Sequence, residues 1–246
     1  LPPLGFVRAA KGYVAPLDNG DAINVAVDAE SDRLQLLQPF EKWDGKDFTS
    51  LPVLLKAKGK CTTDHISPAG VWLKYRGHLD KISDNMLLGA VSAFTGKPGE
   101  SKNQDTGAVL ATPQVARAYK AAGKRWVVVG DENYGEGSSR EHAAMSPRHL
   151  GAAAIIVRSF ARIHESNLKK QGILPLTFAN PNDWNKVRED DEMSVPEALA
   201  IAPGRTVQMI LHHSDGTEEE IQAKHSCNAE QIGWIQAGGA LNLLRH

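Results

Sequence analysis

The sequence predicts an α/β fold with a mostly parallel sheet, followed by a C-terminal β-hairpin and a terminal helix. Two observations support this class. Through the middle of the chain, apolar strand-like runs alternate with helical stretches, which is typical of parallel strands joined by right-handed helical crossovers. Near the C-terminus, two strand-like runs instead flank a Ser-Asp-Gly turn, which indicates an antiparallel hairpin.

The individual elements follow from apolar periodicity and from glycines at the helix ends. In chain order we expect a strand at 51–57, a loop at 58–65, a loop at 100–107, a helix at 113–122, a strand at 126–129, a helix at 138–150, a strand at 154–157, a helix at 163–171 and a strand at 174–178. Glycines directly after the three helices are typical C-caps. The hairpin strands are expected at 206–213 and 218–224, and the last helix at 228–244 with Asn228 as N-cap.

The first 50 residues differ from the rest of the chain. They are rich in Gly, Pro and Asp and contain one strand-like patch, at 22–27. We therefore expect residues 1–50 to be a linker and arm, and residues 51–246 to form the compact domain. Because the chain starts with Leu-Pro-Pro and lacks an initiator Met, we expect a fragment or processed product of a longer protein whose N-terminal body is missing here.

Composition excludes several classes of function. Lys and Arg total 28 against 29 Asp and Glu, which is not the basic surplus of a nucleic-acid binder. No apolar run approaches the roughly 18–20 residues of a membrane span, so no membrane partner is expected. Cys61 and Cys227 lie far apart and outside any Cys-x-x-Cys pair. We expect two free thiols in a reducing compartment and no metal site, since a cluster needs three or four ligands.

The segment at 130–144, GDENYGEGSSREHAA, is the strongest candidate for a functional site. It follows a buried strand, and Gly135 and Gly137 allow a ligand to approach the backbone closely. Ser138, Ser139 and Arg140 are then predicted to open a helix, where N–H groups and a guanidinium bind carboxylates. A helix N-cap beside a surface charge is the structural alternative. The combination favours a small substrate that carries several negative charges.

Two further segments add chemistry, although each also has a structural explanation. Thr62–Ser67 places Asp64 and His65 between hydroxyls, which indicates either a proton relay or a capped turn. Arg76 follows in LKYRGHL, and the polar helix start at 160–167 is explained by capping and packing. Arg76 and Arg140 together can hold two carboxylates, while Ser138 and Asp64 supply acid–base groups. This set suits proton abstraction α to a carboxylate.

These motifs, TTDHIS at 62–67, LKYRGHL at 73–79, the segment at 130–144 and SFARIHESNLKKQGILPLTF at 159–178, closely resemble the C-terminal swivelling domain of mitochondrial-type aconitases. The resemblance runs from about residue 31 to the C-terminus. The SSRE and ILP segments are also similar to the small subunit of isopropylmalate isomerase. The resemblance implies a swivelling β/β/α domain in the mitochondrial matrix, and interconversion of citrate and isocitrate through cis-aconitate.

The resemblance also implies a 4Fe-4S cluster and individual roles for the site residues. In the family, three cysteines of other domains hold the cluster, whose free iron acts on the substrate hydroxyl as a Lewis acid. Transferred by motif, the catalytic set is Ser138 as base with Asp64 and His65, where Asp64 protonates or orients the leaving hydroxyl. The substrate-binding set is Arg76, Ser139, Arg140, Ser67 and Thr63.

Three departures from the family pattern shape these expectations. The cluster cysteines are absent, so we expect no activity until cluster-bearing domains are supplied in cis or in trans. Asp84-Asn85 stands where an Asn-Asn pair is commoner, which leaves open a paralogue acting on homocitrate. Ala152-Ala153 replaces a Gly-Gly pair and is conservative in size. A catalytically silent assembly module remains a further alternative, and nucleic-acid binding a more remote one.

Overall fold

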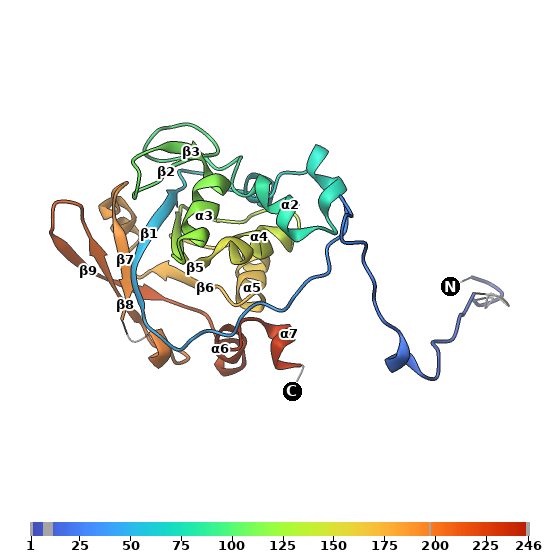
Figure 1. Ribbon diagram of the computed structural model, residues 1–246. Coiled ribbons are helices and arrows are strands. Elements are labelled where there is room, and N and C mark those ends of the chain that lie inside the picture. The colour runs from blue at the N-terminus through green and yellow to red at the C-terminus, as the bar shows by residue number, and fades with distance from the viewer. Residues whose placement is uncertain (1, 7–11, 197, 245–246) are drawn as a thin grey trace.

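The computed structural model describes residues 2–6, 12–196 and 198–244, and its central feature is a closed barrel of seven strands (Figure 1). The strand order around the barrel is β1-β4-β5-β6-β9-β8-β7. The strands are β1 (Phe48–Lys56), β4 (Trp126–Gly130), β5 (Ala152–Val157), β6 (Leu174–Phe178), β7 (Glu192–Val195), β8 (Val207–His212) and β9 (Glu218–Lys224). The first four pair in parallel, and antiparallel pairing joins the others and closes β7 onto β1.

Helices cover the parallel strands on the side away from the antiparallel half (Figure 1). The three longer crossover helices are α3 (Thr112–Ala121), α4 (His142–Leu150) and α5 (Arg162–Lys170). Shorter elements are α1 (Thr63–Ile66), α2 (Leu79–Ile82), α6 (Ala229–Gln236), α7 (Ala240–Leu243), the pair β2 (Glu100–Lys102) and β3 (Val109–Ala111), and 3-10 turns at Gly20–Ala22, Gly70–Tyr75, Ser83–Asn85, Pro181–Lys186 and Ala198–Ala200. The predicted α/β class with parallel strands is confirmed, whereas closure into a barrel was not predicted.

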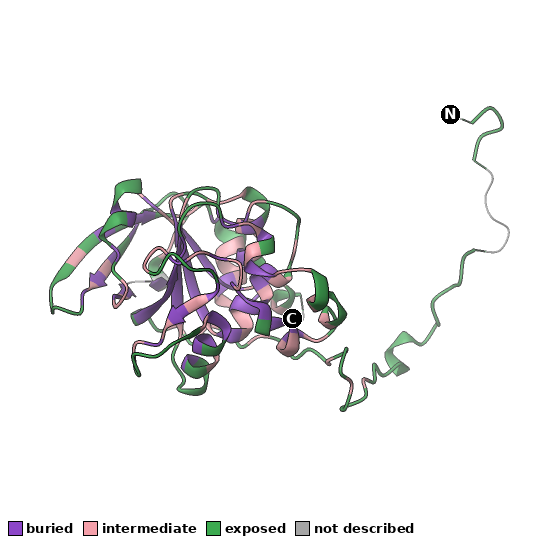
Figure 2. Cartoon of the chain, turned by 90° about the horizontal axis from the view of Figure 1, so that it is seen from above, coloured by how far each residue is buried: buried purple, intermediate pink, exposed green. Residues whose placement is uncertain are grey.

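Two hydrophobic cores lie on opposite faces of the parallel strands. Val127 and Val129 point into the barrel, while Trp126 and Val128 point into the layer of helices. Both faces of β4 are therefore buried, which explains why its sequence is apolar throughout rather than alternating (Figure 2). Each fully buried valine of this kind stabilises the fold by roughly 1.5–3 kcal/mol relative to an exposed one.

The C-terminal prediction is confirmed for the hairpin but not for one continuous helix. Asn228 caps α6 through a capping box with Gln231, as expected of an N-cap. The helix ends at Gln236, and α7 starts only after Gly238 and Gly239, whose φ angles are +84° and +156°. A Cβ atom on Gly238 would lie 2.2 Å from the backbone oxygen of Glu41. Because the N-terminal arm passes so close here, only glycine fits at this position, and the helix ends before it.

Other expectations were wrong in detail. The strand-like patch at 22–27 is the end of a 3-10 turn followed by irregular chain, because none of the described strands lies beside it and its side chains are mostly exposed. The expected loop at 100–107 begins with strand β2, which pairs with β3. Strand β7 was not predicted, since its four residues follow a run of acidic residues and carry little periodicity.

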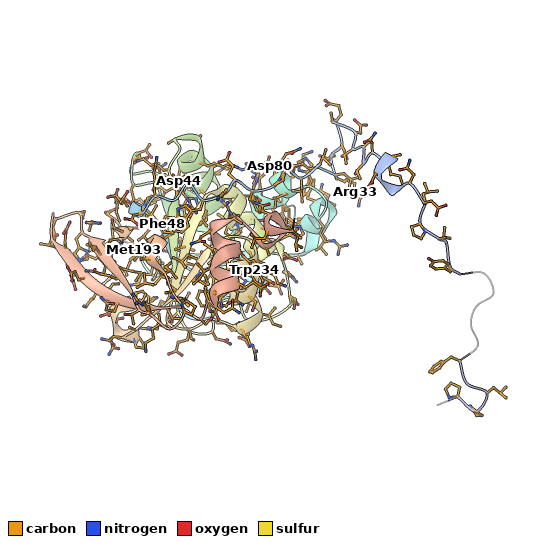
Figure 3. All side chains as sticks on the ribbon, turned by 90° about the horizontal axis from the view of Figure 1, so that it is seen from below. Arg33, Asp44, Phe48, Asp80, Met193 and Trp234 are labelled. Carbon is orange, nitrogen blue, oxygen red and sulfur yellow. The ribbon has the colours of Figure 1, made fainter. Side chains whose placement is uncertain are left out.

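The arm crosses the body before the barrel begins at Phe48 (Figure 3). Gln35 N donates to Gly77 O (2.8 Å), Arg148 Nη2 donates to Glu41 O (2.7 Å), and Trp43 N donates to Gln236 O (3.2 Å). These contacts tie the stretch between Arg33 and Phe48 to the helical side of the domain. Residues 12–30 extend away from the body (Figure 1). The division into an arm (1–50) and a domain (51–246) stays a prediction.

Candidate active site

The loops that follow β1, β4 and β5 meet at the carboxyl edge of the parallel strands, where ligands bind in such sheets. Gly135 N donates to Cys61 O (2.7 Å), and Thr63 N donates to Glu136 O (2.9 Å). On the other side, Tyr134 N donates to Ser159 O (2.9 Å). These bonds continue the parallel pairing beyond the strands, so the central loop is anchored on both sides.

The path of this loop differs from the expected helix start. Helix α4 begins at His142, not at Ser138, and its N-cap residue makes no side-chain capping bond. Gly137 has a φ angle of +119°, and Arg140 N donates to Ser138 O (2.7 Å), a tight i to i−2 turn that excludes helical geometry. Ser138 and Ser139 are therefore exposed on the loop, and their hydroxyls are not used for capping.

Arg140 connects the two principal motifs. Its guanidinium forms an ion pair with Asp64 and donates from Nη1 to Ser67 O (3.0 Å). The Asp64 side chain is 57% exposed and the Arg140 side chain 26% exposed, so both can be reached by a ligand. The structure thus brings Asp64, Ser67 and Arg140 together, beside the loop that carries Ser138 and Ser139.

The acidic residues that flank Arg140 in the sequence bond to other partners. Glu136 forms an ion pair with Lys60 (3.1 Å). Asp131 accepts from Arg158 Nη1 (2.8 Å) and from Gly59 N (2.8 Å). Burial raises the pKa of Asp131, but these donors outweigh burial and keep the pKa below its ordinary value. The acids near Arg140 in sequence instead anchor neighbouring loops.

His65 completes a capping box at the start of α1. Thr62 Oγ1 accepts from His65 N (3.2 Å), and the Thr62 N–H donates to His65 Nδ1 (3.2 Å). The structural interpretation of this segment as a capped turn is confirmed. The cap places Asp64 in the first turn of α1, facing Arg140. A catalytic role for His65 stays a prediction.

Asn85 supports Ser67, a relation that the sequence did not reveal. Its side chain is fully buried and donates from Nδ2 to Pro68 O (2.8 Å) and to Ser67 Oγ (3.3 Å). Asp84, the residue that departs from the family pattern, faces the surface and accepts from Arg117 Nε (2.8 Å). The departure therefore lies on the side of the pair that turns away from the site.

Arg76 is a predicted site residue that the structure does not join to the ion pair of Arg140 with Asp64. It is exposed at the end of a 3-10 turn, and no hydrogen bond or ion pair joins its guanidinium to another described residue. Its backbone oxygen lies 3.0 Å from His142 Nε2, near the start of α4. Binding of a second carboxylate by Arg76 stays a prediction.

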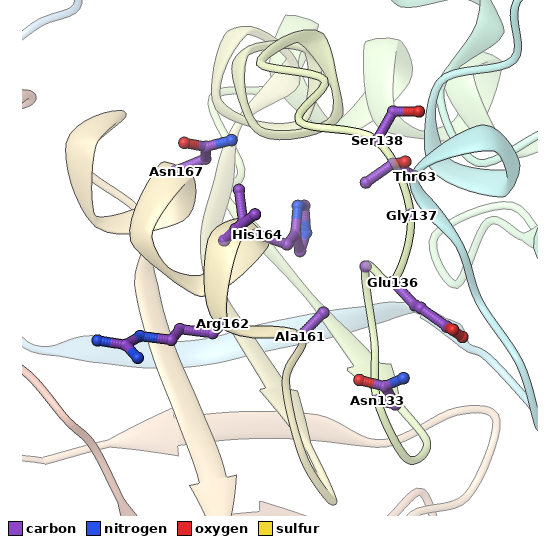
Figure 4. Close-up of a pocket in the computed structure, with 11 residues that line it drawn as sticks. Thr63, Asn133, Glu136, Gly137, Ser138, Ala161, Arg162, His164 and Asn167 are labelled. Atoms are coloured by element: carbon purple, nitrogen blue, oxygen red, sulfur yellow. The ribbon is translucent and has the colours of Figure 1, made fainter.

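A pocket of about 260 Å³ lies between the glycine loop and the start of α5 (Figure 4). Thr63 and Ser138 line it, as do His164 and Asn167, which sequence reasoning assigned only to capping and packing. His164 is 2% exposed, and burial lowers its pKa to about 4, so it is neutral at pH 7. Among the described residues, neither ring nitrogen of His164 nor Thr63 Oγ1 has a hydrogen-bond partner.

The described residues do not fit an iron–sulfur cluster. Cys61 and Cys227 are free and buried, and burial raises their pKa values to about 12 and about 11, away from the thiolate form that binds metals. No cluster of three or more His, Cys, Asp or Glu side chains in this part of the chain could hold a metal ion. No helix here is long and apolar enough to cross a membrane.

Fold and site together define a mixed α/β domain with a glycine- and serine-rich loop beside an Arg–Asp ion pair at the edge of its parallel strands. A family model described as the aconitase C-terminal domain matches residues 51–181, more than half of the chain. The chain belongs to this family.

Similar proteins extend the likeness over the whole chain, including the arm. A probable mitochondrial aconitate hydratase of Dictyostelium discoideum is 58% identical over 246 residues, which is 100% of this chain and 32% of that protein. A mitochondrial aconitate hydratase of Gracilaria gracilis is 55% identical over 245 residues, again 100% of this chain and 32% of that protein. The chain spans about a third of the length of these relatives.

One solved structure, a 3-isopropylmalate dehydratase from Methanocaldococcus jannaschii, has the same general fold. Its TM-score is 0.55 at 20% sequence identity, and the match covers 81% of this chain and 94% of that chain.

Proposed function

We propose that this chain is the swivelling C-terminal domain of an aconitate hydratase of the mitochondrial matrix, which interconverts citrate and isocitrate through cis-aconitate. The observation that carries the proposal is the pairing of Arg140 with Asp64 beside two exposed serines on an anchored loop. The names of the relatives, mitochondrial aconitate hydratases, supply the reaction and the compartment.

Ser138 is the proposed base. A serine hydroxyl accepts a carbon-bound proton only when its alkoxide is stabilised by nearby positive charge. Arg140, two residues along the same tight turn, supplies that charge, and it also stabilises the carboxylate whose negative charge grows as the proton leaves. The Ser138 hydroxyl is available for this because the loop ends before helix α4 begins.

Arg140 and Ser139 are proposed to bind one substrate carboxylate. Arginine presents N–H groups in a planar fork that matches the two oxygens of a carboxylate. Asp64 and the Ser67 carbonyl engage one edge of the fork and hold its orientation. Arg76 is proposed to bind a second carboxylate, and Thr63 and Ser67 to line the pocket.

Asp64 is proposed to protonate or orient the leaving hydroxyl, with His65 beside it. Its carboxyl group is solvent-accessible, so a proton can reach it, and the ion pair with Arg140 holds it at the same edge as Ser138. Base and acid then lie on loops after two different strands, β4 and β1, and the bonds between those loops set their separation.

A 4Fe-4S cluster and the rest of the tricarboxylate site are proposed to come from domains outside this chain, in cis or in trans. The two buried thiols and the absence of a metal-ligand group among the described residues support that assignment. The chain by itself is therefore expected to be inactive.

Reconstitution tests the proposal. We expect that adding the cluster-bearing part of a relative to this chain yields conversion of citrate to cis-aconitate. The ultraviolet absorbance of cis-aconitate measures this conversion. Arg140→Lys should then lower kcat/KM by about 100-fold or more, because a point charge does not reproduce two-point binding. Arg205→Lys is the matched control, since Arg205 is exposed close to β8 and does not line the pocket. Full activity of Arg140→Lys would refute the carboxylate role.

The homocitrate alternative receives no support from the structure. It was motivated by Asp84, whose carboxylate pairs with Arg117 on the side away from Ser67. The substrate preference of the assembled enzyme decides between citrate and homocitrate.

A further inference from the structure

His164 is packed against the backbone of the glycine loop. A Cβ atom built on Gly135 would lie 2.2 Å from Cγ and 2.3 Å from Cδ2 of the His164 ring. The same ring stacks at a tilt against Tyr134, with 5.5 Å between ring centroids. The imidazole therefore occupies the space where residue 135 would otherwise carry a side chain, and it sets how close the loop comes to α5.

The contact works through shape rather than through hydrogen bonds. Neither ring nitrogen has a partner among the described residues, and the ring is neutral at pH 7. The ring and Gly135 both line the pocket of about 260 Å³, so removal of the ring leaves the loop free space to move into. The amide of Gly135, bonded to Cys61 O, lies on the same short stretch that leads to Ser138.

We propose that His164 is a positioning residue, which holds the loop from Gly135 to Ser138 in place by the contact of its ring with Gly135. The proposal rests on the proposed role of Ser138 as base. The ring does not touch the reacting atoms; it determines where the Ser138 hydroxyl lies relative to Arg140 and Asp64.

Hydrogen exchange in this chain tests the positioning independently of catalysis. His164→Ala should speed exchange of the Gly135 and Arg140 amides about tenfold, with the Val128 amide of β4 as internal reference for global stability. His164→Phe, which keeps a planar ring, should leave both amides unchanged. Asn167 lines the same pocket one turn along α5, and Asn167→Ala serves as the control variant, in which exchange of both amides should stay unchanged. Unchanged exchange in His164→Ala would overturn the proposal.

A double-mutant cycle tests the contact itself. Gly135→Ala pushes a methyl group into the ring and also strains a backbone with φ of +83°, whereas removal of the ring relieves only the clash. Gly135→Ala should therefore accelerate exchange of the Arg140 amide in both backgrounds. The acceleration factor should be about five times smaller in the His164→Ala background than in the native one. Additive effects would show that the ring does not hold the loop.

Kinetics of the reconstituted enzyme connect positioning to function. His164→Ala should lower kcat about tenfold with KM for citrate nearly unchanged, and His164→Phe should restore kcat. If the native assembly does not convert citrate, the proposed function fails, while the exchange experiments still decide whether His164 holds the loop. Altered exchange with an unaltered kcat would overturn the link from the loop to Ser138.

Discussion

Two buried histidines show how differently the two halves of the barrel use polar groups. In the antiparallel half, His213 Nδ1 lies 2.7 Å from Asp191 Oδ1, and Nε2 lies 3.3 Å from Glu219 Oε1. At the edge of the parallel half, His164 is equally buried but has no partner among the described residues. Unpartnered buried groups destabilise a fold, and they persist where geometry serves a site. We infer that the bonded ring of His213 contributes to stability, and that the ring of His164 serves the proposed site at the parallel edge.

The largest expected effect lies at the parallel edge. Ser138→Ala should lower kcat of the reconstituted enzyme by about 10²–10⁴-fold, since the proposed base for proton abstraction would be lost. The melting temperature should not change, because the Ser138 hydroxyl makes no hydrogen bond to another described residue. Ser214→Ala, in the exposed turn between β8 and β9, is the control. Near-full turnover of Ser138→Ala would show that the base has been misassigned.

The converse experiment breaks the antiparallel half. Asp191→Ala removes the partner of His213 Nδ1 and the acceptor of Arg188 N (2.7 Å). We expect a loss of about 3 kcal/mol in the free energy of unfolding, measured with urea. Turnover of the folded fraction should be unaffected. Glu218→Ala, which removes an exposed partner of His212, should cost less than about 1 kcal/mol. Equal losses of unfolding free energy in Asp191→Ala and Glu218→Ala would show that the buried pair stabilises the fold no more than the exposed pair.

The pH dependence of stability sharpens the contrast further. The pKa of His164 is lowered from 6.5 to about 4 by burial, so between these pH values the unfolded chain binds a proton that the folded chain does not. Stability should therefore fall as the pH falls, by about 2 kcal/mol between pH 7 and pH 5 from this residue. The difference between the native chain and His164→Phe in urea titrations isolates the effect. The same dependence of unfolding free energy on pH in both proteins would contradict this contribution of His164.

The smallest effect is expected at Asp84. Asp84→Asn restores the commoner pair and breaks a half-exposed ion pair with Arg117. Stability should change by less than about 1 kcal/mol, and the preference for citrate over homocitrate should be unchanged. Steady-state kinetics with both substrates provide the measurement. A switch in substrate preference would support the hypothesis that the chain belongs to a homocitrate paralogue.

Local patterns in the sequence predicted most of the parallel half. Apolar runs and helix-ending glycines are local signals, and they placed β4, β5, β6, α3 and α5 within a few residues. The barrel closes through β7, whose pairing with β1 joins residues more than 100 positions apart and leaves no local trace. The same limit applies to the site. Its serines and arginines were found by motif, but the tight turn at Ser138 depends on Thr63 bonding to Glu136, a contact between distant loops.

His164 illustrates what no pattern contains. Its position on α5 was visible in the sequence as part of a polar helix start, and a histidine there is compatible with capping, packing or catalysis. Only the fold shows that both nitrogens lack a partner among the residues described, and that the ring faces a glycine on another loop.

Closure of the seven-stranded sheet has a consequence for solubility. Every strand of the barrel has neighbours on both sides, so the sheet has no open edge on which a strand of another molecule could add. Under the proposed function, swivelling would uncover the domain each time the enzyme opens, and a domain supplied in trans would be uncovered until it meets its partner. With its edges paired internally, such a domain can be exposed repeatedly without seeding aggregation.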